Sequence, residues 1–506
     1  KVHFALKKRN CHTSEGGGNL TACWFQARAD RLPPSGAMIL GIRNGINSMC
    51  SLIAGSRSVQ FCRHKWLLAP LLAIAFVIRC WGAGDGALWL DEGYTVIQAR
   101  SSIAEIFARE LTDPNPPLSV VIFHIWSRHI GDAFFNTVEL SFRSLSIVFG
   151  MLSLVVSWRI ARRLMDVNAV NAFLLLLALS AMHVHLSQQA RIYAVALFVA
   201  LLCIDSITER ARVDWFSLTL RLSLLVYLHF SGLLFAAALY LILLARLKHG
   251  EEELIPLWRS ATGFFLLTLP AAALAVVHPL RYPSLSWLPE FSLATTLDAI
   301  SGSLLWYGSL SPVQATMLLS LACLGGVRLY HVDRQRWILL VGWWLAPLAC
   351  AILLACIGPN LLHPRYQYYS LPPFLMLAAI GLNSLQPKLV RYAALAVMAT
   401  LSLTSLGRHH EQVAQTAALR EQLLALKDLQ SKCPIVHLSK CGFVLDFIYR
   451  NNPADTFLAE GTGEANVLRH WLDKNPYISD REISGLQCVE FLRLPCHRSR
   501  HAFTGN

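Results

Sequence analysis

The chain has 506 residues, of which 55% are hydrophobic and only 15% charged, and its mean hydropathy is +0.45. Soluble globular proteins carry about 25% charged residues, whereas here apolar residues form long blocks such as 222–244 and 337–357. This excludes a disordered, collagen-like or small disulfide-stapled chain and argues against a soluble enzyme with one core. The composition predicts a polytopic membrane protein.

Residues 1–62 are predicted to be a disordered or non-native extension without function. They do not begin with Met, contain Gly16–Gly18 and show neither helical nor strand periodicity. Met38 and Met49 both lie nearer the first apolar block, so the true N-terminus stays open. The formal net charge is +13, and residues 1–65 hold ten Lys/Arg against two acidic residues. Because no basic face on a folded domain is visible, nucleic acid is not an expected partner.

Apolar runs of about 17–25 residues predict membrane-spanning helices in residues 63–406, the expected transmembrane module. About eleven spans are expected, at 64–83, 141–161, 167–186, 190–207, 215–229, 231–247, 260–278, 309–328, 336–357, 367–386 and 390–406. The block 215–247 is too long for one helix and is divided at His229–Gly232. The stretch Pro117–Ile130 is too short to span, so a surface helix is expected there, within an external loop at 84–140.

Basic residues cluster in the loops on one side of this arrangement, which the positive-inside rule makes cytoplasmic. The clusters are Arg159/Arg162/Arg163, Arg210/Arg212, Arg246/Lys248, Arg328/Arg334/Arg336 and Lys388/Arg391. The other side, with the loop 84–140 and the whole C-terminus, is therefore predicted to be external.

Residues 407–506 are more polar, with twelve Lys/Arg and eleven Asp/Glu, and are predicted to be a small external α/β domain. Helical patterning at 411–429 precedes apolar runs at 435–438, 456–459 and 489–494. Four of the thirteen cysteines lie here, and an even number in an oxidising compartment suggests two disulfides of undetermined pairing. They are Cys433, Cys441, Cys488 and Cys496.

The external side also collects polar residues that a simple span does not need. Carboxylates there can deprotonate a hydroxyl or hold a divalent cation, and arginines can bind a lipid phosphate bidentately. The candidates for catalysis are Asp91 and Glu92. The candidates for substrate binding are Arg79, Tyr94, Asn115, Arg143, Gln189, Arg191, Tyr193, His229, Arg365 and Tyr366.

Each candidate also has a purely structural interpretation. Asp91 and Glu92 suit the cap and first turn of a helix, where acidic groups are favourable. Arg79, Arg191 and Arg365 suit interfacial anchors beside an aromatic belt. The argument for a site is that all of these residues fall on one side, while the cytoplasmic loops show only basic clusters.

On these residues the sequence resembles the polytopic GT-C glycosyltransferases of the glycosyltransferase-39-like type, which include protein O-mannosyltransferases and aminoarabinose transferases. The resemblance runs from about residue 67 to 385. It is carried by Leu-Trp-Leu-Asp-Glu-Gly (88–93), Asn-Pro-Pro-Leu (115–118), Phe-Arg-Ser-Leu-Ser (142–146), Ser-Gln-Gln-Ala-Arg-Ile-Tyr-Ala (187–194), Tyr-Leu-His-Phe (227–230) and His-Pro-Arg-Tyr (363–366). Each motif is loose, but their order and spacing together are fairly specific.

The resemblance implies an enzyme that transfers a sugar, with inversion, from a polyprenyl-phosphate donor to an acceptor hydroxyl. It implies a bacterial inner-membrane protein with its active site on the periplasmic side. Asp91 would be the general base or a metal-linked carboxylate, with Glu92 as its neighbour. Arg143 and Arg365 would stabilise the leaving lipid phosphate, with Arg191 and Tyr193 completing the cavity; Arg79 matches no family motif and is added for its position and charge.

Two departures leave the need for a metal open. Many relatives have His where Asn115 stands and an acidic residue where Gln189 stands. The expected partners are the lipid-linked donor, membrane lipids and a glycan, lipid or protein acceptor. Neither the sugar, the acceptor nor the oligomeric state is determined by the sequence.

Two other functions are weighed against the transferase. A lipid or solute transporter or flippase would show midplane charges or broken helices and paired halves, which this sequence lacks. A membrane-anchored binding scaffold would place its function in residues 407–506.

Overall fold

The structure is a computed structural model of the chain. It describes residues 56–110, 116–209, 213–247, 254–281, 290–305, 312–357, 360–428, 435–437, 448, 456–458, 477–478 and 490–492. The chain divides into a unit at Lys1–Lys65 and a unit at Trp66–Asn506. Of the first unit only the start of helix α2 is described, and every other described element belongs to the second. The predicted boundary of the extension at residue 62 lies inside α2, which begins at Ser56.

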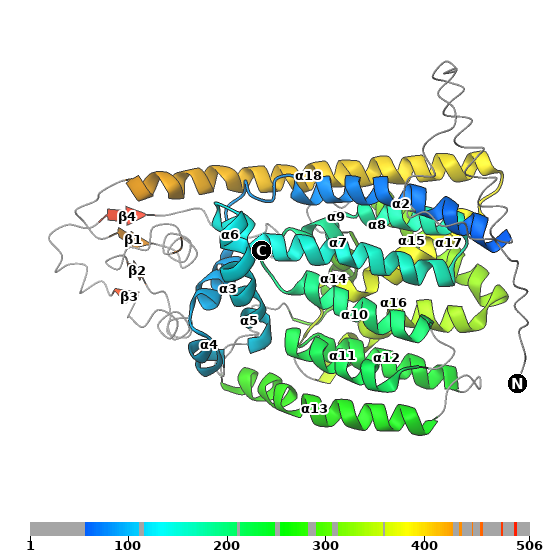
Figure 1. Cartoon of the computed structure of the whole chain (residues 1–506), viewed down its shortest axis with the longest axis horizontal. Helices are drawn as coiled ribbons and strands as arrows, with labels where there is room; N and C mark the ends of the chain where they lie inside the picture. Colours follow the sequence, from blue (N-terminus) through cyan, green and yellow to red (C-terminus); the bar gives the residue numbers. More distant parts are fainter. Residues whose placement is uncertain are drawn as a thin grey trace, which may run out of the picture. The chain divides into compact units, whose positions relative to one another are not determined.

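Long apolar helices dominate the second unit (Figure 1). They are α2 (Ser56–Cys80), α7 (Val138–Leu164), α8 (Val167–Ala178), α9 (Ala181–Ser187), α10 (Tyr193–Glu209), α11 (Trp215–Leu228), α12 (Gly232–Leu247), α13 (Leu254–Arg281), α14 (Leu293–Leu305), α15 (Pro312–Val332), α16 (Arg334–Ile357), α17 (Leu371–Ser384) and α18 (Lys388–Asp428). Each of the eleven predicted spans overlaps a helix, and the span at 167–186 is a pair, α8 and α9, bent by 56°.

The exact number of crossings stays a prediction. Among the described residues, α7, α13, α15, α16 and α18 are long and apolar enough to cross a membrane, and the α8–α9 pair would be a sixth. The apolar helices in α2, α10, α11 and α12 are shorter. The predicted division at His229–Gly232 is confirmed, since α11 ends at Leu228 and α12 begins at Gly232. A Cβ at Gly232 would lie 2.9 Å from the carbonyl oxygen of Leu225, so the close turn there requires glycine.

The predicted external loop folds into short helices, α3 (Leu90–Arg100), α4 (Ile103–Glu110), α5 (Pro117–Trp126), η1 (Ser127–Gly131) and α6 (Asp132–Phe134). A short helix was expected over 117–130, and α5 with the π-turn η1 confirms it. Its place at a membrane surface stays a prediction. In α3, Asp91 and Glu92 occupy the first turn, where the helix dipole favours acidic groups.

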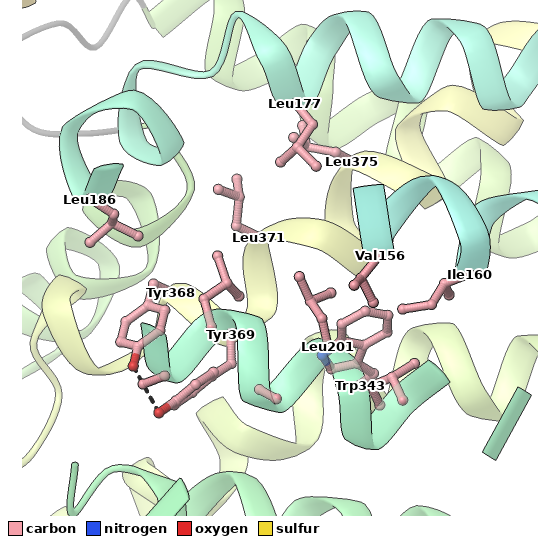
Figure 2. Packing of buried hydrophobic residues seen from close by; sticks show 14 of the residues in the cluster. Val156, Ile160, Leu177, Leu186, Leu201, Trp343, Tyr368, Tyr369, Leu371 and Leu375 are labelled. Atoms are coloured by element: carbon pink, nitrogen blue, oxygen red, sulfur yellow. Dashed lines mark hydrogen bonds between the residues drawn. The ribbon is translucent and has the colours of Figure 1, made fainter. Parts of the chain in front are cut away.

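The core is formed where α7, α8, α10, α16 and α17 meet (Figure 2). Trp343 of α16 is 1% exposed and is surrounded by aliphatic side chains of α7 and α10. Two 3₁₀ turns, η3 (Pro364–Tyr366) and η4 (Tyr368–Ser370), lead into α17 and bury Tyr368 and Tyr369. These turns connect the core to the candidate site, because η3 carries Arg365.

Helices α15 and α17 approach each other at two glycines. A Cβ at Gly325 would overlap the carbonyl oxygen of Leu377, and a Cβ at Gly381 would overlap that of Leu321. The backbones are thus in contact, as in helix pairs of membrane proteins that pack through small residues.

Gly381→Ala is therefore expected to destabilise the protein by about 2 kcal/mol or more, because overpacking must push the two helices apart. Gly326→Ala is the matched control, since its nearest neighbour would be a Val341 methyl group at 3.9 Å. Denaturant unfolding in detergent would measure both variants. Equal unfolding free energies would contradict the close contact.

The C-terminal region contains four short parallel strands, β1 (Ile435–His437), β2 (Thr456–Leu458), β3 (Tyr477–Ile478) and β4 (Glu490–Leu492), in the order β3-β2-β1-β4. Three of them coincide with predicted apolar runs, and β3 was missed because a two-residue strand leaves no periodic signal. Parallel neighbours need crossover connections, but these segments and the four C-terminal cysteines lie outside the described residues. The predicted α/β domain therefore stays a prediction.

The span predicted at 390–406 and the helical patterning at 411–429 lie in one continuous helix, α18, over Lys388–Asp428. The predicted domain boundary at residue 407 therefore falls inside a helix. Neither Pro nor a helix-capping pattern interrupts residues 406–411, so the helix continues beyond the apolar part.

Candidate active site

The structure brings Asp91 and Arg365 into contact across 274 positions of sequence. Arg365 Nη1 donates to Asp91 Oδ2 at 3.0 Å, and the guanidinium lies 4.2 Å from the centre of the Trp89 ring. The Asp91 side chain is 34% exposed and that of Arg365 is 16% exposed. Asp91 is thus a carboxylate that an incoming hydroxyl can reach, beside a cation that an incoming phosphate can reach.

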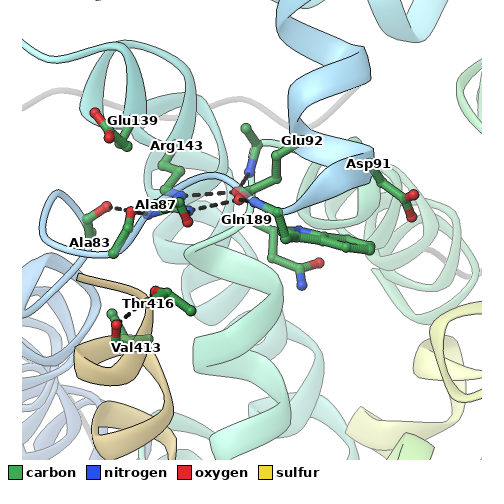
Figure 3. Close-up of polar contacts among 12 residues, drawn as sticks. Ala83, Ala87, Asp91, Glu92, Glu139, Arg143, Gln189, Val413 and Thr416 are labelled. Carbon is green, nitrogen blue, oxygen red and sulfur yellow. Dashed lines mark hydrogen bonds and ion pairs between the residues drawn. The ribbon is translucent and has the colours of Figure 1, made fainter. Parts of the chain in front are cut away.

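Glu92, the next residue, has an entirely different environment (Figure 3). It is completely buried, and both carboxylate oxygens accept hydrogen bonds. Oε1 accepts from Arg143 Nε at 2.9 Å and from the Ala190 backbone N–H at 2.6 Å, while Oε2 accepts from Arg143 Nη2 at 2.7 Å and from the Trp89 N–H at 3.1 Å. Figure 3 shows Asp91 directed away from this cluster.

Arg143, on α7, uses its remaining N–H groups to hold the segment that precedes α3. Nη1 donates to the carbonyl oxygens of Ala83 (2.9 Å) and Gly86 (3.0 Å), and Nη2 donates to that of Ala87 (3.0 Å). The expected direct roles of Glu92 in catalysis and Arg143 at the lipid phosphate do not fit this geometry, because both side chains are buried and directed at protein groups. Their contacts hold the chain next to Asp91 instead.

Arg191 binds the backbone of Asp91 rather than its side chain. Its Nη1 donates to the Asp91 carbonyl oxygen at 3.1 Å and to Thr95 Oγ1 at 2.9 Å. Arg191 and Thr95 also line a small cleft between α3 and α5, together with Gln98, Ser119, Val120, Phe123 and Ile192. Thr95 and Trp89 were not among the predicted site residues; Thr95 lies one helical turn after Asp91, a spacing that could have indicated it.

Aromatic rings fill the space behind Arg365. The His229 ring lies 5.3 Å from that of Tyr193 and 5.4 Å from that of Tyr366, centre to centre. His229 Nδ1 is 2.7 Å from Ser231 Oγ, at the break between α11 and α12. Burial raises the pKa of Tyr366, so its phenol stays neutral. The structure thus brings together Tyr193, His229 and Tyr366, as expected.

His363 fixes the turn that presents Arg365. Its Nδ1 accepts a hydrogen bond from the Arg365 backbone N–H at 3.2 Å, as an N-cap residue does. Burial, and secondarily the Arg365 charge, lowers the pKa of His363 to about 3. The imidazole is therefore neutral at pH 7 and can serve as the acceptor.

The other predicted site residues lie farther from this contact or outside the described part of the chain. Arg79 is completely buried and donates to the carbonyl oxygens of Ala75 (2.9 Å) and Ala178 (3.3 Å), at the bend between α8 and α9. Its expected substrate-binding role does not fit, because it is directed into the protein. Gln189 contacts His185, and Tyr94 is half-buried on α3. Asn115 lies outside the described residues.

The surroundings of Asp91 do not match those of a divalent cation. Ca²⁺ and Mg²⁺ need several oxygen ligands, whereas the charged partners of Asp91 and its backbone are Arg365 and Arg191. Within the described part of the chain, no three His, Cys, Asp or Glu residues are grouped so as to hold a metal ion.

Neither a protein-family model nor a curated protein sequence matches the chain. Among solved structures, it is similar to ArnT from Cupriavidus metallidurans in the apo state, with a TM-score of 0.57, 14% identity, and coverage of 84% of this chain and 90% of ArnT. ArnT bound to undecaprenyl phosphate gives a TM-score of 0.58 at 12% identity, covering 83% of this chain and 90% of that one. The chain shares the fold of these ArnT structures. Its long apolar helices are those of an integral membrane protein.

The apo form of the Archaeoglobus fulgidus oligosaccharyltransferase is also similar, at a TM-score of 0.46 and 12% identity, over 77% of this chain and 64% of that one. This score is too low to support a residue-level comparison. At 12–14% identity the ArnT structures establish the shared fold, so the roles of the side chains depend on the geometry above.

Glu92→Gln is expected to lower the free energy of unfolding by about 3–5 kcal/mol, because it leaves the Arg143 charge buried without its partner. The side chains of this pair are 1% and 8% exposed. Asp333→Asn is the matched control, since the Asp333–Arg336 pair is 32% and 47% exposed and should contribute only about 0–1 kcal/mol. Denaturant unfolding in detergent measures both, and similar losses would contradict the assignment.

The lowered pKa of His363 predicts a specific acid sensitivity. In the unfolded chain this imidazole titrates near its ordinary pKa of about 6.5, so between pH 6.5 and about 3 the unfolded state binds the extra proton. Stability therefore falls as the pH is lowered through this window. His363→Asn retains a capping acceptor without the titration, so its unfolding free energy should depend less steeply on pH, by up to about 1.4 kcal/mol per pH unit.

Unfolding curves at pH 7.5, 6 and 5 would measure this difference. His129→Asn, which replaces an exposed imidazole, is the control for loss of a histidine. Parallel pH dependences for wild type and His363→Asn would show that His363 is not the responsible group.

Proposed function

We propose that this protein is a membrane glycosyltransferase that moves a sugar from a polyprenyl-phosphate donor to an acceptor hydroxyl, by an inverting single displacement. The observation that carries the proposal is the partly exposed Asp91 carboxylate in contact with Arg365, within a fold shared with ArnT. That ArnT has been solved with undecaprenyl phosphate supports a donor of this class. The proposed compartment is the bacterial inner membrane, with the site and C-terminus on the periplasmic side.

The chemistry requires one base and one stabilising cation. Asp91 takes the proton of the acceptor hydroxyl while the oxygen of that hydroxyl attacks the anomeric carbon of the donor sugar. The bond from that carbon to the phosphate oxygen breaks, and the polyprenyl phosphate leaves with the electron pair. Arg365 stabilises the negative charge on the departing phosphate, since a guanidinium binds phosphate strongly and bidentately.

The Asp91–Arg365 contact implies that the donor binds before Asp91 acts as a base. Without donor, the two side chains neutralise each other at 3.0 Å. A lipid phosphate competes with Asp91 for Arg365, because it offers the guanidinium more oxygen acceptors than one carboxylate contact does. Donor binding therefore both positions the leaving group and releases Asp91 to act as a base.

The remaining partners follow from the proposed reaction. They are the lipid-linked donor, membrane lipids, and an acceptor that is a glycan, a lipid or a protein. The donor can carry a hexose, a pentose or an amino sugar, and the surroundings of Asp91 favour none of them.

Asp91→Asn should lower the turnover rate by about 10²–10⁴-fold, the usual contribution of a general base. Purified protein would be incubated with a panel of radiolabelled polyprenyl-phosphate sugars, and sugar release to water or to crude membrane acceptor would be followed. Asp85→Asn is the matched control, because Asp85 is an exposed carboxylate in the segment leading to the same helix. It should retain full activity.

The donor affinity of Asp91→Asn should be retained or increased, since Arg365 remains and no longer pairs with a carboxylate that competes with the donor phosphate. Release that is unaffected by Asp91→Asn would refute the proposed base. No release from any donor by folded wild-type protein would refute the transferase and favour transport, which uptake in vesicles would then test.

A further inference from the structure

Helix α18 extends beyond the predicted span and contacts the segment that leads to Asp91. Its residues 409–420, here called the outer segment of α18, meet residues 81–87 at several points (Figure 3). The Ala87 N–H donates to the Thr416 carbonyl oxygen at 3.3 Å. A Cβ at Gly86 would overlap Thr416 Oγ1 and come within 3.1 Å of the Val413 carbonyl oxygen. The two backbones therefore lie in direct contact.

The outer segment is also tied to the end of α2. The His410 ring stacks on that of Trp81, with centroids 4.1 Å apart and planes inclined by 29°. His409 Nε2 lies 2.8 Å from Gln188 Oε1, and Gln188 Nε2 donates to the Trp81 carbonyl oxygen at 2.8 Å. Gln188 is two residues before Ala190, whose N–H donates to Glu92. The contacts of α18 thus reach two segments that lead to partners of Glu92: residues 81–87 before Trp89, and Gln188 before Ala190.

A third contact joins the outer segment to α7. Arg420 Nε donates to Glu139 Oε1 at 2.6 Å, and the Glu139 side chain is 1% exposed. Glu139 lies one helical turn before Arg143, which holds the carbonyl groups of residues 83, 86 and 87. Helix α7, which carries Arg143, and the segment 83–87 that Arg143 binds are therefore both in contact with α18.

We propose that the outer segment of α18 is a positioning element for Asp91. It acts through the backbone of residues 81–87 and through α7, and its side chains need not touch the substrate. This inference rests on the proposed role of Asp91 as the base. Since α18 ends at Asp428 and β1 begins at Ile435, the same helix that contacts the segment before α3 leads directly in sequence to the C-terminal strands.

Second-site suppression tests the contact directly. Gly86→Ala should lower kcat by about 10–100-fold, the scale of a misplacement of about 1 Å, with little change in the donor KM. Thr416→Ala removes the nearest obstructing atom and keeps the carbonyl group that binds Ala87, so alone it should change kcat by less than about twofold. The double variant should recover most of the lost kcat. Gly407→Ala, on the same helix with nothing within 4 Å of the new Cβ, is the control.

Amide hydrogen exchange provides a measurement that does not need activity. Gly86→Ala and Arg420→Ala should both increase exchange in residues 83–92 and leave the amides of α15 to α17 unchanged. Arg420→Lys, which retains the charge at Glu139, should restore protection. A variant that merely lowers global stability would instead increase exchange throughout the protein.

Failure of Thr416→Ala to improve Gly86→Ala, or unchanged exchange in residues 83–92 in both Gly86→Ala and Arg420→Ala, would overturn the proposal. If wild-type protein transfers no sugar, the proposed function fails by itself. The exchange experiment then still decides whether α18 orders the segment before Asp91.

Discussion

The buried ion pair between Glu92 and Arg143 is the interaction on which the site depends. Two opposite charges removed from water are stable only if the remaining hydrogen-bonding positions are also satisfied. Here the protein meets that condition with its own backbone, through the N–H groups of Trp89 and Ala190 and three carbonyl groups of residues 83–87. One charge pair therefore joins α3, α7 and the chain before α10 in a defined geometry.

That arrangement explains why two adjacent carboxylates have different environments. Successive residues of an α-helix point about 100° apart around the axis, and here Glu92 is directed into the protein while Asp91 is directed away from the Glu92–Arg143 cluster (Figure 3). The buried carboxylate fixes the helix, and the exposed one meets Arg365 at 3.0 Å. The two neighbouring carboxylates therefore differ in environment: Glu92 is buried against Arg143, and Asp91 is partly exposed beside Arg365.

The site is supported from three directions, each by groups that do not contact the Asp91 carboxylate. Arg191 binds the Asp91 carbonyl oxygen, His363 caps the turn that carries Arg365, and the outer segment of α18 holds the backbone before α3. Enzymes need such supports because a displacement of about 1 Å at a reacting group costs roughly two orders of magnitude in rate. The aromatic cluster around His229 fills the space behind the site and connects it to the core at Tyr368 and Tyr369.

The sequence by itself determined the helical membrane architecture, the helix boundaries at the α11–α12 break and the motifs that form the site. These features depend on local apolar length and on residues such as Gly232, whose effects act within a few positions. It also placed Asp91 and Arg365 in one region. Only the tertiary structure decided the partners of each charge, because Glu92, Arg143 and Arg79 differ from Asp91 and Arg365 in burial rather than in residue type. The contacts of α18 could not be predicted either, since hydrogen bonds between residues more than 200 positions apart leave no periodic pattern in either segment.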